Sequence, residues 1–166
     1  MITGDSSAVD KSQRLIAVYQ RHVDTVYRVC YTFLHNAADS EDAVQNVFIK
    51  LLNKWVDFES EEHEKAWLIR VASNHCKDVL KNAWNRRTSL ESIAEPLARD
   101  AEPDTTLEEV LKLPENQKVC VYLYYYEGYS AAEIAGIMER PYSTVRNYLS
   151  EARKELGRRL KGGFDE

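Results

Sequence analysis

Apolar residues recur three and four positions apart through most of this 166-residue chain, and this spacing is that of one face of an α-helix. The first such segment runs from about residue 12 to 35 and contains Leu15, Tyr19 and Val26. Strand-like alternation of apolar and polar residues is rare. The chain is therefore expected to be all-α, and its polar first residues, 1–11, are expected to be disordered.

The helical spacing fails over residues 85–106, where two prolines stand among many acidic residues. A segment of about twenty residues without a pattern is uncommon inside one compact domain. We therefore expect two small helical domains, at residues 12–87 and 106–161, joined by an acidic linker at 88–105. Residues 162–166 are expected to form a short tail.

Within the first domain, the pattern predicts three helices. Asp39 or Ser40 is expected to cap the second helix, with acidic residues in its first turn. The predicted buried residues of this helix are Val44, Val47, Phe48, Leu51, Leu52 and Trp55. Residues 56–64 lack periodicity and are expected to be a loop, and the third helix is expected at about 65–84.

The formal charge of −5 conceals a strong segregation of charge along the chain. Residues 39–64 hold eight acidic and two basic residues, whereas residues 65–87 hold six basic residues and one acidic residue. Residues 91–109 hold seven acids and one base, and residues 141–161 hold six bases and two acids. Two basic segments between acidic ones indicate two surfaces for a polyanion, although solvated helix faces would give the same pattern.

The predicted third helix has one apolar and one basic side. Leu68, Ala72 and Cys76 fall on the apolar side. The opposite side carries Trp67, Arg70, Asn74, Lys77 and Lys81. A tryptophan and an asparagine among basic residues are unusual for a face that merely contacts water, so this face is a candidate surface for nucleic acid.

The second domain ends in the pattern of a helix–turn–helix. Pro114 suits the first position of a helix that Gly128 ends, and Ser130 with Glu133 predicts a capping box for a short helix after it. Ser143 is then expected to cap a final helix that reaches about residue 161. Its outer face carries Arg146, Asn147, Ser150, Arg153, Lys154 and Arg158. Such residues near the start of a helix can reach base edges in a major groove, whereas a purely structural bundle is the alternative.

Several classes of function lack support in the sequence. No apolar run approaches the roughly 18 residues that a membrane span needs, and the first ten residues do not resemble a secretory signal. Cys30, Cys76 and Cys120 are too scattered for a disulfide framework or a zinc site, so we expect reduced thiols in a cytoplasmic protein without a metal or other cofactor. Phosphate-binding loops and nucleophile motifs are lacking, so neither enzymatic activity nor a small-molecule substrate is expected.

Five segments resemble the extracytoplasmic-function (ECF) subgroup of bacterial RNA polymerase sigma factors. Residues 40–52 (SEDAVQNVFIKLL) resemble region 2.2 of this family, and residues 66–81 (AWLIRVASNHCKDVLK) resemble regions 2.3 and 2.4. Residues 113–118, 129–135 and 143–156 resemble region 4. The segments follow the order of the family, which implies a region 2 helical bundle followed by a region 4 helix–turn–helix.

The resemblance also implies three sets of site residues. The face that docks on the β′ clamp helices of core RNA polymerase corresponds to Glu41, Asp42, Gln45, Asn46 and Ile49. The set that reads and opens the −10 element corresponds to Phe58, His63, Lys65, Trp67, Arg70, Asn74, Lys77 and Lys81, and the loop at 58–64 is implied to capture an unstacked base. The set for the −35 element corresponds to Ser143, Thr144, Arg146, Asn147, Ser150, Arg153 and Lys154. Arg146 and Asn147 are expected nearest to the bases.

The function that this resemblance implies is that of an alternative sigma factor, which directs core RNA polymerase to −35 and −10 promoter elements and helps to melt the −10 region. The expected partners are core polymerase, through the β′ clamp helices and the β flap, promoter DNA, and a cognate anti-sigma factor that can be membrane-anchored. Two other functions stay open. One is a helix–turn–helix regulator that binds duplex DNA by itself, and the other is an interaction-only protein that sequesters a partner.

Three features of the sequence allow more than one interpretation. Glu151 stands where many relatives have a basic residue, which bears on the −35 sequence that is read. The four glutamates within 59–64 either shape base choice, discourage DNA binding by the free protein, or simply lie in a solvated loop. The tyrosines within 122–126, together with Tyr129, form either the core face of a small domain, which is the preferred interpretation, or a stacking platform for single strands.

Overall fold

The computed structural model describes the backbone of residues 3–87 and 105–164, and the side chains of residues 9–83 and 108–159. Every regular element within these ranges is a helix, which confirms the expected all-α fold.

Internal contacts divide the chain into two compact units, Met1–Ser92 (unit 1) and Ile93–Glu166 (unit 2). The acidic linker expected at 88–105 lies outside the described residues except for Thr105. Each unit is therefore described by itself.

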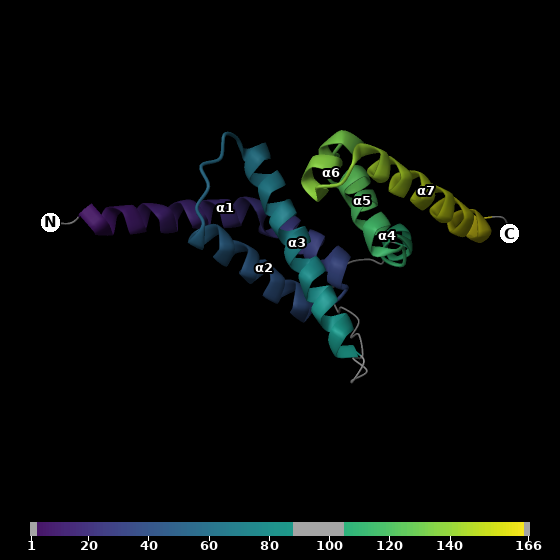
Figure 1. Ribbon diagram of the computed structural model, residues 1–166, viewed down its shortest axis with the longest axis horizontal. Coiled ribbons are helices and arrows are strands. Elements are labelled where there is room, and N and C mark those ends of the chain that lie inside the picture. The colour runs from purple at the N-terminus through teal and green to yellow at the C-terminus, as the bar shows by residue number, and fades with distance from the viewer. Residues whose placement is uncertain (1–2, 88–104, 165–166) are drawn as a thin grey trace. The chain divides into compact units, whose positions relative to one another are not determined.

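Unit 1 is a bundle of three helices, α1 (Thr3–Leu34), α2 (Ala37–Asn53) and α3 (Glu61–Arg87), each of which packs on the other two (Figure 1). The first two run antiparallel, because Tyr19 lies edge-on to Phe48 and Arg14 lies over the ring of Trp55. The buried core draws apolar residues from all three helices, among them Val26, Val29, Val47, Leu51, Leu68, Ile69 and Ala72. The valine, leucine and isoleucine side chains contribute about 1.5–3 kcal/mol each when they are fully buried.

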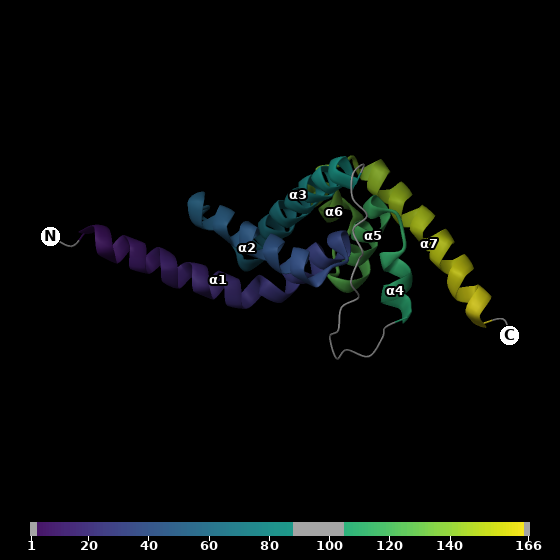
Figure 2. The same cartoon turned by 90° about the horizontal axis from the view of Figure 1, so that it is seen from below.

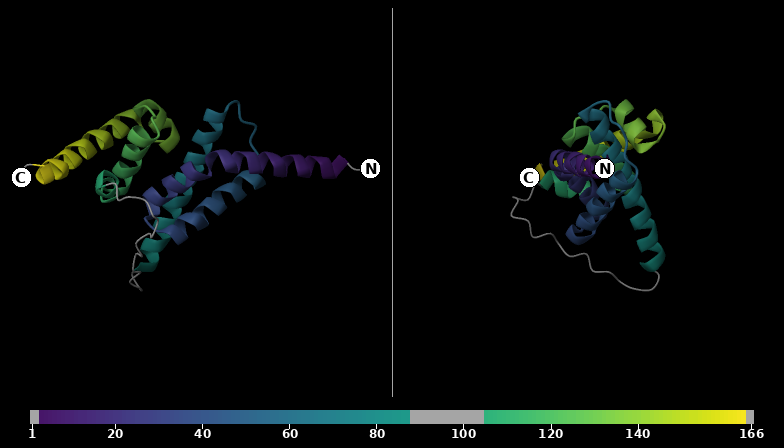
Figure 3. Two further views of the ribbon diagram at one scale, coloured as in Figure 1. Left: turned by 180° about the vertical axis from the view of Figure 1, so that it is seen from behind. Right: turned by 90° about the vertical axis from the view of Figure 1, so that its left-hand side faces the viewer.

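The first helix begins earlier than the sequence predicts. Disorder is expected over residues 1–11, but α1 already begins at Thr3. Its first turns project beyond the end of α2, as Figures 2 and 3 show from other directions. Once a helix exists, each added residue gains a backbone hydrogen bond, so the helix extends without an apolar face to bury. A prediction from apolar spacing therefore places the start too late.

The cap of α2 also differs from the prediction of Asp39 or Ser40. Asn36 is the N-cap, and its side-chain oxygen accepts a 2.9 Å hydrogen bond from the backbone N–H of Asp39. Ser40 is instead buried inside the helix, where its hydroxyl donates to the carbonyl oxygen of Asn36 at 2.6 Å. Leu52, which is predicted to lie in the core, is 44% exposed.

The third helix begins at Glu61, within the segment 56–64 that is expected to be a loop. The hydroxyl of Ser60 accepts a hydrogen bond of 3.1 Å from the backbone N–H of His63, which satisfies one of the free donors of the first turn. Acidic side chains in that turn interact favourably with the helix dipole. These local polar effects define the start of α3 where apolar spacing gives no signal.

Unit 2 contains α4 (Thr105–Leu111), α5 (Glu115–Val121), a π-helical turn η1 (Tyr122–Tyr126), α6 (Ala131–Met138) and α7 (Tyr142–Phe164). The last helix packs against α4, α5 and α6. The inner residues Val145, Leu149 and Ala152 of α7 are buried, as are Val119 of α5, Leu123 of η1 and Ile134 of α6. Because α7 continues to Phe164, most of the expected tail at 162–166 is helical.

The capping box predicted for α6 is confirmed. The hydroxyl of Ser130 accepts from the backbone N–H of Glu133, and the side chain of Glu133 accepts from the backbone N–H of Ser130, both at 3.1 Å. Pro114 is the N-cap of α5 and not its first residue. Ser143 lies inside α7 and does not cap it, because the carbonyl oxygen of Pro141 already accepts from the N–H of Thr144.

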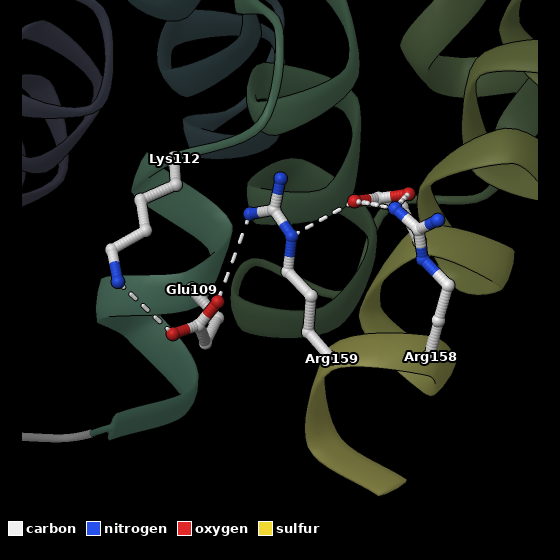
Figure 4. A network of polar contacts seen from close by, with 5 residues as sticks. Glu109, Lys112, Arg158 and Arg159 are labelled. Carbon is white, nitrogen blue, oxygen red and sulfur yellow. Dashed lines mark hydrogen bonds and ion pairs between the residues drawn. The ribbon is translucent and has the colours of Figure 1, made fainter. Parts of the chain in front are cut away.

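A network of ion pairs ties α4 to α7 on the outside of unit 2 (Figure 4). Arg159 lies 2.9 Å from Glu155 on its own helix and 3.7 Å from Glu109 on α4. Lys112 and Arg158 extend the network at either end. Because these side chains are partly or largely exposed and screened by water, each pair contributes little to stability.

Candidate nucleic-acid interface

A buried polar cluster fixes the first turn of α3 against α1. Oε1 of Glu64 accepts hydrogen bonds from Nε and Nη2 of Arg21, at 3.2 and 2.9 Å, and lies 2.8 Å from Nε2 of His22. Glu64 and His22 are both buried. The interpretation of residues 59–64 as a solvated acidic loop is therefore wrong for Glu64, whose carboxylate is buried against two side chains of α1.

An aromatic cluster lies just before and within this turn. Phe58 lies edge-on to His63, with 5.4 Å between ring centroids, and edge-on to Trp67, with 5.7 Å between them. Nδ1 of His63 also accepts a hydrogen bond of 3.2 Å from the backbone N–H of Glu59. Phe58 thus contacts two other residues expected at the −10 element, and the loop is held onto the helix that follows it.

The remaining −10 candidates lie along α3. Asn74 and Lys81 are exposed, whereas Lys65, Arg70 and Lys77 are half-buried. The opposite side of the helix is buried at Leu68, Ile69, Ala72, Ser73 and Cys76. The predicted division of α3 into an apolar and a basic side is therefore present, with Trp67 at the half-buried edge.

The candidate polymerase-binding residues lie on the outside of α2. Glu41, Asp42, Gln45 and Ile49 are exposed, and Asn46 is half-buried, with its side-chain amide donating to the carbonyl oxygen of Asp42 at 2.9 Å.

One further residue of this face was missed from the sequence. Leu52 is one helical turn from Ile49, and the two are 44% and 52% exposed. Together with Ile49 it gives the outside of α2 a small exposed apolar area. Apolar spacing alone assigns Leu52 to the core, because it lies at the border between the buried and exposed sides of α2.

At the edge of this face, Nζ of Lys50 lies 3.4 Å from Nδ1 of His75 on α3. Burial and the neighbouring charge of Lys50 lower the pKa of His75, and the carboxylates of Asp78 and Asp42 partly oppose this shift. The neutral imidazole is therefore favoured where α2 and α3 meet.

The helix–turn–helix predicted in the second domain is present as α6, a tight turn and α7. Glu139 ends α6 in the left-handed conformation, with φ of 54°, and α7 follows within three residues. Most of the candidate −35 residues are exposed on α7: Ser143, Arg146, Asn147, Ser150, Arg153 and Lys154. Thr144 is half-buried.

The tyrosines of residues 122–126 do not all belong to the core. Tyr122 is buried, as predicted, but Tyr125 and Tyr126 are 54% and 43% exposed, so the core interpretation is wrong for these two. The guanidinium of Arg153 lies over the rings of Tyr124 and Tyr125, and its Nε donates a 2.8 Å hydrogen bond to the hydroxyl of Tyr125. These contacts raise the pKa of Arg153, since they stabilise its charged form.

Glu151 lies on a different side of α7. Its Oε2 accepts a 3.1 Å hydrogen bond from the side-chain amide of Gln117 on α5. Because successive residues of a helix turn by about 100°, Glu151 points away from the flank of α7 that carries Arg146 and Arg153, but it lies one turn after Asn147 on the same side of the helix. The contact gives Glu151 a partner within unit 2.

The described part of the chain gives no sign of a membrane-spanning helix or a metal site. No helix there is both long and apolar enough to cross a membrane, and no group of three or more His, Cys, Asp and Glu residues there could hold a metal ion. The three cysteines are free thiols, and all are buried.

Two family models match this chain, in the order that the sequence predicts. Sigma-70 region 2 matches residues 18–86, and Sigma-70 region 4 matches residues 106–156. These ranges contain α2 and nearly all of α3 in the first unit, and α6, the turn and the first two thirds of α7 in the second.

Whole-chain relatives agree. The RNA polymerase sigma-H factor of Pseudomonas aeruginosa is 26% identical over 177 residues, which cover 95% of this chain and 89% of that protein. The ECF RNA polymerase sigma-E factor of Haemophilus influenzae is 33% identical over 146 residues, covering 74% of this chain and 75% of that protein. The sigma factor RpoE of Bartonella quintana, solved in complex with the anti-sigma factor NepR, has the same fold, with a TM-score of 0.69 at 23% identity over 92% of this chain and 97% of that one. This chain therefore belongs to the ECF subgroup of RNA polymerase sigma factors.

Proposed function

We propose that the two units divide the work of this sigma factor, with unit 1 docking on core RNA polymerase and opening the −10 element and unit 2 reading the −35 element. The observation that carries the proposal is the cluster of Phe58, His63 and Trp67 at the start of the basic helix α3. A regulator that only binds duplex DNA has no need of it, whereas a protein that opens DNA must hold an unstacked base.

Core polymerase is proposed to bind the outside of α2. The exposed polar residues Glu41, Asp42 and Gln45 provide hydrogen-bonding groups, and the exposed Ile49 and Leu52 provide apolar area. An apolar centre with a polar rim is the usual composition of a protein–protein interface. The β′ clamp helices are the proposed partner of this face, and the β flap is the proposed partner of unit 2.

Opening of the −10 element is assigned to the aromatic cluster and the basic side of α3. Arg70, Lys77 and Lys81 are proposed to contact phosphates, which positions the DNA without selecting its sequence. Phe58, His63 and Trp67 are proposed to form the wall against which an extruded base stacks, with Asn74 and Lys65 beside it. Base–aromatic stacking is worth about 1–3 kcal/mol per base, which offsets much of the cost of unstacking.

Reading of the −35 element is assigned to the exposed side of α7. Arg146 and Asn147 lie in the first turns of α7, the second helix of the helix–turn–helix, where side chains can reach base edges in the major groove. Ser143, Thr144, Ser150, Arg153 and Lys154 are proposed to contact the backbone. The chain itself is proposed to be a specificity subunit without catalytic activity, since the chemistry of transcription belongs to core polymerase.

A cognate anti-sigma factor is also proposed, because the Bartonella quintana protein with the same fold was solved bound to one. Such an inhibitor is expected to co-purify with the chain and to stop its binding to core polymerase. Release of the inhibitor only after membrane solubilisation would support the more specific proposal that it is membrane-anchored, and co-purification without inhibition would contradict the assignment.

Selection from duplexes with randomised blocks tests the main proposal against its alternatives. The library is incubated with the chain alone, with core polymerase alone and with both, and the retained duplexes are sequenced. Enrichment of a two-element sequence is expected only with both proteins, because an acidic chain binds DNA weakly by itself. Enrichment by the chain alone would indicate a helix–turn–helix regulator that binds duplex DNA by itself. Binding to core polymerase without enrichment of any sequence would indicate a protein that only sequesters a partner.

A further inference from the structure

The side chain of Arg153 is held in one orientation by the π-helical turn η1. Its Nε donates a 2.8 Å hydrogen bond to the hydroxyl of Tyr125, and its guanidinium carbon lies 5.4 and 5.9 Å from the ring centroids of Tyr124 and Tyr125. The two rings are themselves edge-on, with 4.9 Å between centroids. The guanidinium therefore has one directed hydrogen bond and two aromatic contacts, although Arg153 and Tyr125 are both exposed.

The π-helical geometry accounts for the two consecutive tyrosines that meet Arg153. In η1 the backbone N–H of Glu127 bonds to the carbonyl oxygen of Tyr122, and that of Tyr129 bonds to the carbonyl oxygen of Leu123. A π-helical turn contains more residues than an α-helical turn, so consecutive side chains point in more similar directions. Tyr124 and Tyr125 can therefore both face α7. Single π-helical turns are rare and occur frequently at functional sites.

The position of Arg153 on α7 is at the edge of the candidate DNA-binding side. It is seven residues, or about two turns, after Arg146, so the two arginines lie on the same flank of the helix. Arg146 also lies over an exposed tyrosine, Tyr142, at 5.8 Å. Asn147 and Lys154 lie farther from the core than this flank. Because Arg153 lies about two turns farther from the start of α7 than Arg146, it is placed for the rim of a groove, whereas residues near the start of the helix reach its floor.

We propose that Arg153, Tyr124 and Tyr125 form a phosphodiester-binding subsite at the rim of the −35 groove, in which Tyr125 is a positioning residue that aims the guanidinium at a phosphate. The proposal rests on the proposed function of α7 and goes further by assigning the tyrosines of η1 a role in it.

The chemistry of the guanidinium supports this subsite. A guanidinium carries five N–H donors, of which the one on Nε is directed to Tyr125, while the outer edge carries N–H groups in the fork that matches two phosphate oxygens. Because the side chain is already ordered, less rotamer entropy is lost when the phosphate binds.

The same contacts argue against a stacking platform for single strands at this place. Arg153 already lies over the rings of Tyr124 and Tyr125, which a base would need to approach. The subsite therefore suits the backbone of a duplex.

The test uses holoenzyme, assembled from core polymerase and the full chain, on a promoter duplex recovered by the selection described above. Promoter binding is measured over a series of salt concentrations for Tyr125→Phe, Arg153→Ala and the double variant. Tyr126→Phe is the matched control, since it removes the hydroxyl of the next exposed tyrosine in the same turn. Arg146→Ala reports on the proposed function of α7 independently.

Loss of one phosphate contact in Arg153→Ala is expected to reduce the slope of log K against log salt by about 0.9. Tyr125→Phe is expected to weaken binding roughly threefold to tenfold, as for the loss of one ordinary hydrogen bond, and to move the slope in the same direction. A purely structural role would leave the slope unchanged. Because Tyr125 acts through Arg153, Tyr125→Phe is expected to have less than about a twofold effect in the Arg153→Ala background.

Unchanged binding and slope in Tyr125→Phe and Arg153→Ala, with weakened binding in Arg146→Ala, would overturn the subsite and leave the proposed function standing. An effect of Tyr125→Phe that persists in full in the Arg153→Ala background, or an equal effect of Tyr126→Phe, would also overturn it. Unchanged binding in all of these variants, Arg146→Ala included, would instead contradict the assignment of α7 to the −35 element.

Discussion

Oε1 of Glu64, in the first turn of α3, lies 2.8 Å from Nε2 of His22 in the middle of α1, and both side chains are buried. Arg21 binds the same carboxylate oxygen from the side that faces solvent. This contact fixes where α3 begins relative to α1, and with it the loop that carries Phe58. Removal of the carboxylate would leave the polar groups of α1 without their partner inside the bundle.

We expect Glu64→Ala to lower the free energy of unfolding of unit 1 by about 1–3 kcal/mol, since it leaves buried polar groups unsatisfied. Glu61 offers a matched control, because its exposed carboxylate lies 4.0 Å from Arg21 and its removal should cost less than about 0.5 kcal/mol. Urea unfolding followed by tryptophan fluorescence reports on unit 1 alone, since all three tryptophans lie within it. Equal effects of the two variants would contradict this account of the cluster.

A charge placed on the outside of α2 is expected to block core polymerase without unfolding the protein. Leu52→Glu should weaken binding to core polymerase by tenfold or more, at roughly the size of an interface hot spot, because it buries a carboxylate in the proposed apolar centre. Unfolding by urea should change little, since Leu52 is 44% exposed. Gln13→Glu adds the same charge at an exposed position of α1 and should leave core binding unchanged. If Leu52→Glu binds core polymerase as well as the unaltered protein does, Leu52 is not part of the docking face.

Phe58→Ala is expected to impair promoter opening more than promoter binding. Loss of one stacking partner, worth about 1–3 kcal/mol, should reduce transcription from a linear duplex roughly tenfold. On a template with a preformed bubble at the −10 element, transcription should be close to that of the unaltered protein, because the cost of unstacking has been removed. An equal loss on both templates would show that Phe58 does not act in opening.

Stability of unit 1 is expected to fall as the pH is lowered through about 6.5, the ordinary pKa of histidine. Burial and Lys50 lower the pKa of His75 in the folded state, so the unfolded chain binds more protons in this range and is favoured at low pH. His75→Gln should remove part of this dependence, and Lys50→Met should reduce it. Unfolding in urea between pH 7.5 and 5.5 measures the effect, and an unchanged pH dependence in both variants would contradict it.

Glu151→Ala is expected to leave the preferred −35 sequence unchanged. The carboxylate accepts from Gln117 within unit 2, so its loss removes an exposed contact worth about 0.5–1.5 kcal/mol and no contact to a base. Asn147→Ala, by contrast, should relax selection at one position of the element. Repeating the selection from randomised duplexes with both variants tests this, and a shifted −35 sequence for Glu151→Ala would place this residue at the bases.

The sequence predicts those structural features whose interacting residues lie close together along the chain. The capping box of Ser130 and Glu133 is such a case, because both partners lie within one turn, and the buried side of α7 follows directly from its apolar spacing. The partners of Glu64 are 42 and 43 residues away, so nothing near it distinguishes this glutamate from its exposed neighbours.

The contact between Tyr125 and Arg153 is a second case that the sequence does not reveal. The two residues are 28 positions apart, and they meet because of a π-helical turn that spacing rules do not anticipate. The prediction that Leu52 is buried is wrong for a simpler reason. An apolar residue at the border between the buried and exposed sides of a helix can lie on either side. The exposed faces of α2 and α7 are predictable, whereas the contacts that orient side chains on them are not.

Run-off transcription with core RNA polymerase tests the central claim most directly. On a promoter recovered by selection, transcripts with a defined start are expected only when core polymerase and this protein are both present. Gln45→Ala should reduce these transcripts roughly tenfold by weakening core binding, and Arg146→Ala should reduce them only on promoters with an intact −35 element. Tight binding of the protein alone to the same duplex, with no transcript when core polymerase is added, would contradict the assignment of the two units to promoter recognition and opening.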